Sequence, residues 1–195
     1  MAYKFGLDEM MTKINILREE LTLADRYCPI EHVSSRLKSL ENIREKALRI
    51  DCPPTLEAVR DGIFDIAGIR IVCSFISDAY TVMEMVTGQP DVELVRARDY
   101  IAEPKSNGYR SLNLVVRIPV HLSDRVELVL VEVQIRTVAM DFWASLEHKI
   151  HYRYHRAVPP RLAGDLLDAA EMAGRLDEHM ERLHAEVLAR EGDAP

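Results

Sequence analysis

The most apolar run of the 195-residue chain reads Phe64-Asp65-Ile66-Ala67-Gly68-Ile69-Arg70-Ile71-Val72-Cys73-Ser74-Phe75-Ile76. Its β-branched residues predict the central strand of a sheet, which the chain enters through Gly68. Asp65 and Arg70 would be costly in the middle of a buried strand. We therefore expect these two side chains to pair with each other, to lie at the mouth of the strand or to serve a ligand.

Further strands are predicted downstream, at Val92 to Arg98, Leu112 to Ile118 and Val126 to Arg136, with a turn from Pro119 to Asp124 before the last. Alternation in the last strand gives one apolar face, and a second face that carries Leu128, Leu130, Glu132, Gln134 and Arg136. The second face changes from apolar to polar midway. This change predicts a face that leaves the core and enters a cleft, or one that emerges into solvent at the sheet edge.

Helices are predicted on both sides of these strands. They cover an amphipathic stripe from Leu7 to Ala24 that ends before Pro29, about His32 to Ile50, a short helix from Thr55 to Gly62, and a helix from a Ser77 or Asp78 cap to Val86. Thr137 is expected to cap another helix, which runs to about Tyr154 with Ala139, Trp143, Leu146 and Ile150 on its buried stripe. The pattern predicts one α/β (α+β) domain over residues 1–195, with an N-terminal helix in 1–30, a core in 31–155 and a C-terminal helix in 160–191.

The C-terminal helix has a sustained four-three apolar spacing after Pro159-Pro160. The stripe consists of Leu162, Leu166, Ala169, Ala173, Leu176, Met180, Leu183 and Val187. Spacing of this kind predicts helix-on-helix packing of the coiled-coil type. The partner is either the first helix of the same chain or a second subunit, and symmetric closure of a subunit contact favours a dimer or a dimer of dimers.

A polar, turn-rich loop from Arg98 to Leu112 connects two of the predicted strands. Pro104 and Asn107-Gly108 are chain-reversal signals. The cations and two tyrosines concentrated here suggest a phosphate-bearing ligand whose base stacks on a tyrosine ring. An ordinary solvated hairpin connection explains the loop equally well.

The overall composition excludes several classes of protein. A formal net charge of -7 argues against a general nucleic-acid-coating protein. Three widely spaced cysteines indicate neither a disulfide framework nor a CxxC metal site, and no apolar run is long enough for a signal peptide or a membrane span. We therefore expect a soluble, cytoplasmic protein.

The candidate active residues come from separate segments: Arg36 and Lys38, Asp65 and Arg70, the loop from Arg98 to Arg110, and Glu132 with Gln134. Arg36 either snorkels over the core or points into a cleft. Two carboxylates at strand mouths, surrounded by cations, are typical of Mg²⁺-assisted phosphoryl chemistry. The chain has no Walker loop, GxGxxG or kinase signature. The residues alone therefore predict a Mg²⁺-dependent nucleotide enzyme.

Three histidines, His148, His151 and His155, share one face of the predicted helix after Thr137. Histidines one helical turn apart can chelate zinc. Since no cysteine or HExxH arrangement accompanies them, solvated histidines on a charged helix are the favoured interpretation.

Five motifs in order, over roughly residues 30 to 155, resemble the small alarmone synthetases, the single-domain members of the RelA/SpoT family. The motifs are Ser35-Arg36-Leu37-Lys38-Ser39, Asp65-Ile66-Ala67-Gly68-Ile69-Arg70, Tyr100 to Leu112, Glu132-Val133-Gln134-Ile135-Arg136-Thr137, and Asp141-Phe142-Trp143-Ala144-Ser145-Leu146-Glu147-His148. The resemblance implies a mixed sheet flanked by helices, related to nucleotidyltransferases. It also implies transfer of the β,γ-pyrophosphate of ATP to the ribose 3′-hydroxyl of GDP or GTP, as in the stringent response.

The resemblance also implies residue roles. Arg36 and Arg70 would sandwich the adenine of ATP, and Lys38 and Lys46 would approach its phosphates. Asp65 and Glu132 would bind Mg²⁺, and Glu132 would accept the proton of the attacking hydroxyl. The acceptor nucleotide would have Tyr109 stacked on its guanine and would be lined by Arg98, Lys105, Asn107, Asn113 and Gln134. A homotetramer formed by the terminal helices is implied too, with a central cleft for a regulatory nucleotide such as (p)ppGpp.

The sequence departs from the family pattern at Asn113, usually histidine, and at Ser106, usually proline. Asparagine can donate a hydrogen bond to a phosphate, but it cannot carry charge or shuttle a proton. Reduced activity, altered acceptor preference or catalytic silence could follow. The alternatives are therefore a toxin-like relative acting on adenine nucleotides or tRNA 3′ ends, and a noncatalytic regulator that binds nucleotide or single-stranded RNA. The chain has no room for the family's hydrolase domain, so we expect synthesis without hydrolysis. The residues do not predict which of GDP, GTP and GMP is the preferred acceptor.

Overall fold

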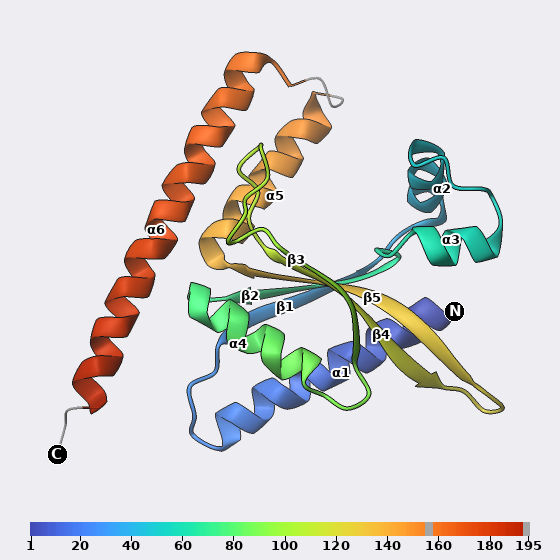
Figure 1. Ribbon diagram of the computed structural model, residues 1–195, viewed down its shortest axis with the longest axis horizontal. Helices are drawn as coiled ribbons and strands as arrows, with labels where there is room; N and C mark the ends of the chain where they lie inside the picture. Colours follow the sequence, from blue (N-terminus) through green and yellow to red (C-terminus); the bar gives the residue numbers. More distant parts are fainter. Residues whose placement is uncertain (155–157, 193–195) are drawn as a thin grey trace.

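A computed structural model describes residues 1–154 and 158–192. Its elements follow in the order α1 (Ala2–Leu23), β1 (Ile30–Leu37), α2 (Leu40–Arg49), α3 (Leu56–Gly62), β2 (Ala67–Cys73), α4 (Ile76–Thr87), β3 (Glu93–Asp99), β4 (Leu112–His121), β5 (Val126–Thr137), α5 (Val138–Arg153) and α6 (Pro160–Gly192). The strands form one mixed sheet in the order β1-β2-β5-β4-β3. The predicted mixed sheet flanked by helices is confirmed (Figure 1).

The core lies on one face of this sheet, around the parallel pair β2 and β5. Ile69 and Ile71 of β2 and Val133 and Ile135 of β5 are at most 2% exposed. Helices α1 and α4 cover this face and bury apolar side chains against it (Figure 1). The opposite face therefore remains for polar side chains.

The predicted helix from His32 to Ile50 is wrong in its first part. Residues Ile30–Leu37 form the edge strand β1, which pairs antiparallel with β2. The helix α2 begins only at Leu40, where Ser39 caps it by accepting the N–H of Asn42 at 3.2 Å. Pairing with a strand 30 residues away thus overrides the local helical spacing.

The turn predicted at Pro119 to Asp124 also lies elsewhere. Strand β4 continues to His121, and the turn is closed by the N–H of Leu122, which donates to the carbonyl of Arg125 at 2.8 Å. Pro119 is tolerated inside β4 because β3 pairs with this strand only as far as Arg117. Beyond that residue one edge of β4 needs no donor, which suits a proline.

Two helix starts test the predicted caps. Thr137 caps α5 as expected, since its Oγ1 accepts the N–H of Met140 at 3.1 Å. Helix α4 begins at Ile76, so neither Ser77 nor Asp78 is its N-cap; the Asp78 carboxylate instead accepts the N–H of Phe75 at 3.1 Å. Asp78 still satisfies a donor at the helix start, but from inside the first turn.

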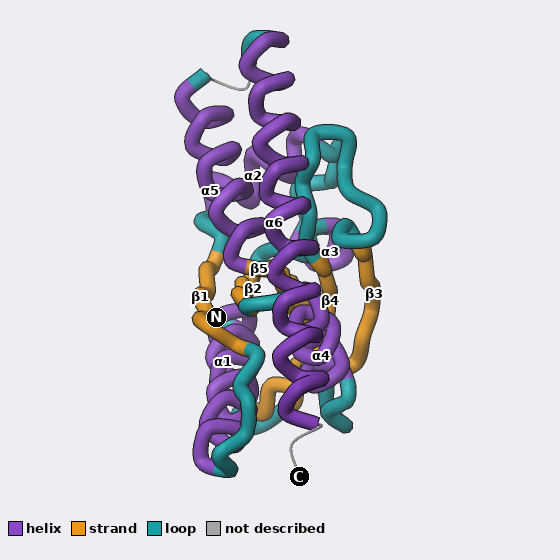
Figure 2. The backbone as a smooth tube through the Cα atoms, turned by 90° about the vertical axis from the view of Figure 1, so that its left-hand side faces the viewer, coloured by secondary structure: helices purple, strands orange, loops and turns teal. Residues whose placement is uncertain are grey.

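The buried side of α5 differs from the predicted stripe. Trp143 is 5% exposed as expected, whereas Leu146 is 40% exposed, and Met140 and Ala144 are buried in its place. The difference arises because α5 packs against α6 rather than lying flat on the sheet (Figure 2).

The long helix α6 lies against α5 and α4, so its docking on the first helix is not the arrangement found (Figures 1 and 2). Its inner side carries the buried residues Ala170 and Asp177. Leu176, Met180, Leu183 and Val187, the second half of the predicted stripe, are 40–54% exposed. No helix in the described part of the chain has the length and apolarity needed to cross a membrane.

Candidate functional site

A row of polar side chains crosses all five strands on the sheet face opposite α1 and α4. The row consists of Ser34, Arg70, Gln134, Asn113 and Arg98, each paired in register with the next. Directly paired residues point to the same face, so these five side chains share one surface. The adjoining row holds Arg36, Gly68 and Glu132. The sheet thus brings together residues predicted from separate segments.

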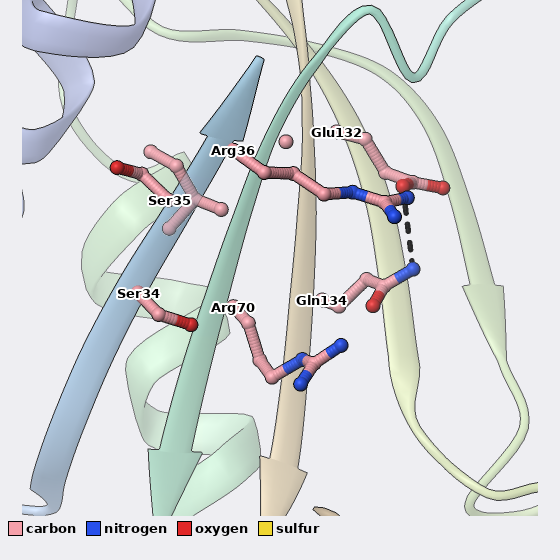
Figure 3. A pocket seen from close by; sticks show the side chains of 8 residues that line it. Ser34, Ser35, Arg36, Arg70, Glu132 and Gln134 are labelled. Carbon is pink, nitrogen blue, oxygen red and sulfur yellow. Dashed lines mark hydrogen bonds between the residues drawn. The ribbon is translucent and has the colours of Figure 1, made fainter. Parts of the chain in front are cut away.

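A cavity of about 170 Å³ opens at the β1 end of these rows (Figure 3). It is lined by Ser34, Ser35, Arg36, Gly68, Ile69, Arg70, Glu132 and Gln134. The stem of Arg36 crosses over Gly68, at whose missing Cβ position the Arg36 Nε would lie only 3.5 Å away. Of the two readings of Arg36, the cleft is therefore the one found, and its guanidinium and that of Arg70 border one cavity.

Asp65 lies before β2 and is held by two lysines rather than by Arg70. Lys38 Nζ lies 2.5 Å from one carboxylate oxygen, and Lys46 Nζ lies 2.6 Å from the other. Burial acts to raise the pKa of Asp65, but the two ammonium groups outweigh it and lower that pKa. Of the three alternatives for Asp65, a pair with Arg70 is wrong and a place at the mouth of the strand is confirmed, while service to a ligand stays a prediction. An incoming phosphate would compete with Asp65 for both lysines.

Glu132 shows the opposite shift. Burial, followed by the nearby negative charge of Asp65, raises the pKa of its carboxyl group, although Arg36 and the lysines oppose this. Its Oε2 accepts a hydrogen bond from Gln134 Nε2 at 3.2 Å. Two carboxylates close enough to repel each other are a favourable place for a divalent cation.

The donor set fits Mg²⁺ bound jointly with substrate. Within residues 1–154 and 158–192, no three His, Cys, Asp or Glu side chains form a cluster able to hold a metal by themselves. Mg²⁺ commonly binds through one or two carboxylates and completes its shell with phosphate oxygens and water. Asp65 and Glu132 would supply the protein ligands.

A second, strongly basic cavity of about 210 Å³ lies between α2 and α5. Arg36, Lys38, Asn42, Glu45, Lys46, Arg49 and His148 line it. It shares the lining residue Arg36 with the first cavity, so the two cavities adjoin at this side chain. Arg49 and His148 were missed as site residues, although Asn42, Lys46 and Arg49 recur at helical spacing on one side of α2. Such a basic cavity suits a polyphosphate.

The loop between β3 and β4 is seated on α6. Gly108 has φ +86°, and a Cβ at this residue would lie 2.4 Å from Ala170 Cβ, so glycine is needed both for conformation and for space. The guanidinium of Arg110 packs in the same way over Gly174. Small residues on α6 thus set the position of this loop.

Tyr109 is fixed at its hydroxyl and covered on its ring. Arg136 NH2 donates to the hydroxyl at 2.8 Å, and Asn113 Oδ1 lies 3.3 Å from it. Lys105 Nζ lies 4.7 Å from the ring centroid, and Tyr100 meets the ring edge to face. A base that stacks on the ring face under Lys105 would therefore have to displace its ammonium group.

The other predicted acceptor residues lie around this loop. Asn107 Nδ2 donates to Glu147 Oε1 on α5 at 3.2 Å. Arg98 and Tyr100 border a wide hollow of about 500 Å³ beside β3. Asn113, at the family's usual histidine position, accepts a hydrogen bond from the Ser111 hydroxyl. The roles of these residues remain predictions.

Of the two alternatives for the second face of β5, entry into a cleft is the one found, because Glu132 and Gln134 line the first cavity. The exposure along this face, however, runs opposite to the expected order. Leu128, at its apolar end, is 63% exposed, whereas Arg136, at its polar end, is 4% exposed. The apolar end extends past the core toward the β4–β5 turn, while the polar end runs beneath the start of α5. Arg136 and its partner Asp141 were therefore missed as site residues, although both belong to the quoted motifs.

The histidine face of α5 does not form a zinc site among the described residues. His148 lines the basic cavity, and His151 Nε2 lies 3.1 Å from Glu147 Oε1. His155 lies outside the described residues.

Asp177 on α6 should make the stability of the protein depend on pH. It is 4% exposed and accepts a hydrogen bond from Thr137 Oγ1 at 2.8 Å. Burial raises its pKa from 3.8 to about 6, against the opposing effects of Thr137 and Arg110. Since the folded state binds this proton more tightly than the unfolded state, the free energy of unfolding should fall as pH rises from about 4 to about 6.

Asp177→Asn is therefore expected to stabilise the protein at pH 7.5 by about 1–2 kcal/mol, with a smaller gain at pH 5. The amide keeps an acceptor for Thr137 without a buried charge. Urea unfolding of both proteins at the two pH values measures this. The exposed Asp168→Asn on the same helix is the control, and an Asp177 variant that is less stable at pH 7.5 would contradict the sign.

Comparison with known proteins assigns the chain to a family. Residues 35–157, more than half of the chain, match the model described as "Region found in RelA / SpoT proteins". The chain is 49% identical over 187 residues to the GTP pyrophosphokinase YwaC of Bacillus subtilis (strain 168), covering 96% of this chain and 89% of the relative. It is 41% identical over 186 residues to YjbM of the same organism, covering 95% and 86%.

Solved structures agree with these relatives. The crystal structure of small alarmone synthetase 2 from Bacillus subtilis has a TM-score of 0.86 at 48% identity, with 95% of both chains covered. That of small alarmone synthetase 1 bound to its product pppGpp has a TM-score of 0.88 at 40% identity, with 95% of this chain and 94% of the other covered. The chain therefore belongs to the RelA/SpoT family, and its resemblance to the small alarmone synthetases of that family is confirmed over nearly its whole length.

Proposed function

We propose that this protein is a GTP pyrophosphokinase that transfers the β,γ-pyrophosphate of ATP to the 3′-hydroxyl of GDP or GTP and so makes (p)ppGpp. The observation that carries the proposal is the shared polar face of the sheet, on which Arg70, Gln134, Asn113 and Arg98 lie in one register row. Residues predicted for both nucleotides thus border one site. The names of the relatives, GTP pyrophosphokinases, support the same reaction.

The donor nucleotide would occupy the two adjoining cavities. Arg36 and Arg70 border the first, which suits a flat base between two guanidinium planes. Lys38, Lys46 and Arg49 border the second, where a triphosphate chain would meet positive charge. A solved small alarmone synthetase 1 bound to AMPCPP supports an ATP-like donor in the family.

Glu132 would act as the general base for the 3′-hydroxyl of the acceptor. Burial raises the pKa of this carboxyl, which makes its ionised form a stronger base. When bound by Asp65 and Glu132, Mg²⁺ would neutralise negative charge on the phosphates that are transferred. Lys38 and Lys46, released from Asp65 as phosphate binds, would add to this neutralisation.

The acceptor would lie against Tyr109, with Arg98, Lys105, Asn107, Asn113 and Gln134 around it. Asn113 sits between Gln134 and Arg98 in the register row, where its amide can donate to a phosphate but carries no charge. Acceptor binding is therefore compatible with asparagine at this position.

Incubation with Mg²⁺, ATP and GDP, followed by separation of the nucleotides, tests the proposal. We expect a 3′-pyrophosphorylated guanine nucleotide and an equal amount of AMP. Absence of both products would overturn it. Parallel reactions with ADP or tRNA as acceptor test the toxin-like alternative.

Tyr109→Ala is expected to weaken GDP binding by about 1–3 kcal/mol, because base–aromatic stacking contributes about this much. The acceptor KM should rise while the ATP KM changes little. An unchanged acceptor KM would contradict the stacking role.

The same variant tests the alternative of an RNA-binding regulator. If single-stranded RNA binds both the wild type and Tyr109→Ala, the RNA site is separate from the nucleotide site.

We also propose a homotetramer, with residues 31–155 as the catalytic core and 160–191 as the oligomerisation helix. The exposed leucines of α6 support this assembly. A regulatory (p)ppGpp in a central cleft is the accompanying proposal. We place the protein in the cytoplasm, where ATP and guanine nucleotides are available.

A further inference from the structure

A single carboxylate oxygen lies between two arginines in different parts of the proposed site. Asp141 Oδ1, on α5, is 3.3 Å from Arg70 NH1 and 3.1 Å from Arg136 NH1. Arg70 borders the donor cavity, whereas Arg136 donates through NH2 to the hydroxyl of Tyr109 at 2.8 Å. The chain of contacts from Arg70 through Asp141 and Arg136 to Tyr109 therefore joins the two halves of the site.

The two guanidinium groups depend on this carboxylate because they repel each other. Burial and then the positive charge of Arg136 lower the pKa of Arg70, and Asp141 counteracts them. Arg136 is only 4% exposed, so solvent screens its charge poorly. Removal of the Asp141 charge would leave two like charges close together, one on the buried Arg136 and one on the partly exposed Arg70.

The orientation of both arginines also rests on few hydrogen bonds. The Nε atoms of Arg70 and Arg136 are buried and have no hydrogen-bond partner among the described residues. Besides Asp141 and Tyr109, Arg136 donates to Gln134 Oε1 at 3.0 Å. Among the described residues, Asp141 is the one carboxylate in contact with either guanidinium, and it is the contact that the two groups share.

We propose that Asp141 is a positioning residue that couples the two nucleotide subsites: it holds Arg70 for the donor base and, through Arg136, holds the Tyr109 hydroxyl so that the ring faces the acceptor base. The inference rests on the proposed function. It assigns Asp141 and Arg136 no contact with the reacting atoms.

Two variants separate this role from a general loss of structure. Asp141→Asn keeps the side-chain shape and removes the charge, and Tyr109→Phe keeps the stacking ring and removes the hydroxyl. Calorimetric titration with GDP, and separately with AMPCPP, gives dissociation constants without turnover. Glu93→Gln is the control, because it removes the Arg117 ion pair between β3 and β4, away from the site.

We expect Asp141→Asn to raise the dissociation constants of both nucleotides about tenfold, and Tyr109→Phe to raise that of GDP alone. The double variant should bind GDP no more weakly than Asp141→Asn, because both changes break one chain of contacts. Glu93→Gln should bind both nucleotides as the wild type does.

Additive effects of the two changes on GDP binding, or unchanged AMPCPP binding in Asp141→Asn, would overturn the inference. If Asp141→Asn does not fold, Arg136→Gln replaces it, and its GDP effect must again be non-additive with that of Tyr109→Phe. A wild-type protein that binds neither nucleotide would instead overturn the proposed function, so the two failures are distinguishable.

Discussion

Asp65→Asn and Glu132→Gln are each expected to lower the rate of product formation by about 10²–10⁴-fold, the range found for removal of a catalytic base or of an electrostatic stabiliser. Each change removes a charge and keeps the side-chain volume. The rate at which the 3′-pyrophosphorylated product forms from ATP and GDP measures both variants.

The two variants should differ in stability, which separates catalysis from folding. Asp65→Asn leaves Lys38 and Lys46 without the carboxylate that they contact, and should cost about 1–3 kcal/mol. Glu132→Gln removes a buried charge whose pKa is raised, so the variant should be as stable as the wild type or more so. Denaturant unfolding measures both.

Glu127→Gln is the matched control for these changes. Glu127 lies near the start of the same strand β5, away from the proposed site, where it contacts Arg125 and Arg60. This variant should keep normal turnover. Near-normal product formation by Asp65→Asn or Glu132→Gln would remove the carboxylate concerned from the proposed chemistry.

The sheet was predictable where the sequence signal is local. The apolar run around Ile71 and the alternation of Val131 and Val133 identify β2 and β5, because burial on one or both faces shows directly in residue type. Strand β1 was not predictable in this way. Its residues are mostly exposed, and they are extended because β2 pairs with them.

The site was predictable as a set of residues but not as a set of contacts. Asp65 is conspicuous as a charge just before an apolar strand and Glu132 as a charge inside one, and both belong to the quoted motifs. The partners of Asp65 could not be predicted in this way. Lys38 and Lys46 reach it from the end of β1 and from α2, which only the folded chain brings together.

The placement of α6 shows the same limit. Its four-three spacing predicts helix packing, yet the side that packs on the loop between β3 and β4 is marked by Gly174 and Ala170, whose small size carries no periodic apolar signal. Asp177 on that side is polar and still buried. The helix could therefore be predicted from its local residue spacing. The side of α6 that packs inward could not, because it depends on the contacts with Gly108 and Arg110.

Replacement of Leu176 and Leu183 by Glu is expected to convert the assembly into single 22.3 kDa chains. The two leucines are 54% and 43% exposed in one chain, so glutamate costs little within the subunit, but at a seam between subunits it would bury charge. Light scattering coupled to size exclusion measures the mass. Circular dichroism should show unchanged helix content.

Leu56→Glu is the control, because Leu56 is 86% exposed on α3, away from the α6 seam, and its replacement should leave the assembly intact. The changes at Leu176 and Leu183 do not alter the inner side of α6, where Ala170 and Gly174 lie against the loop between β3 and β4. The dissociated chains should therefore still bind GDP. A wild-type mass near 22.3 kDa would mean that α6 packs only within its own subunit and that its exposed leucines do not hold subunits together.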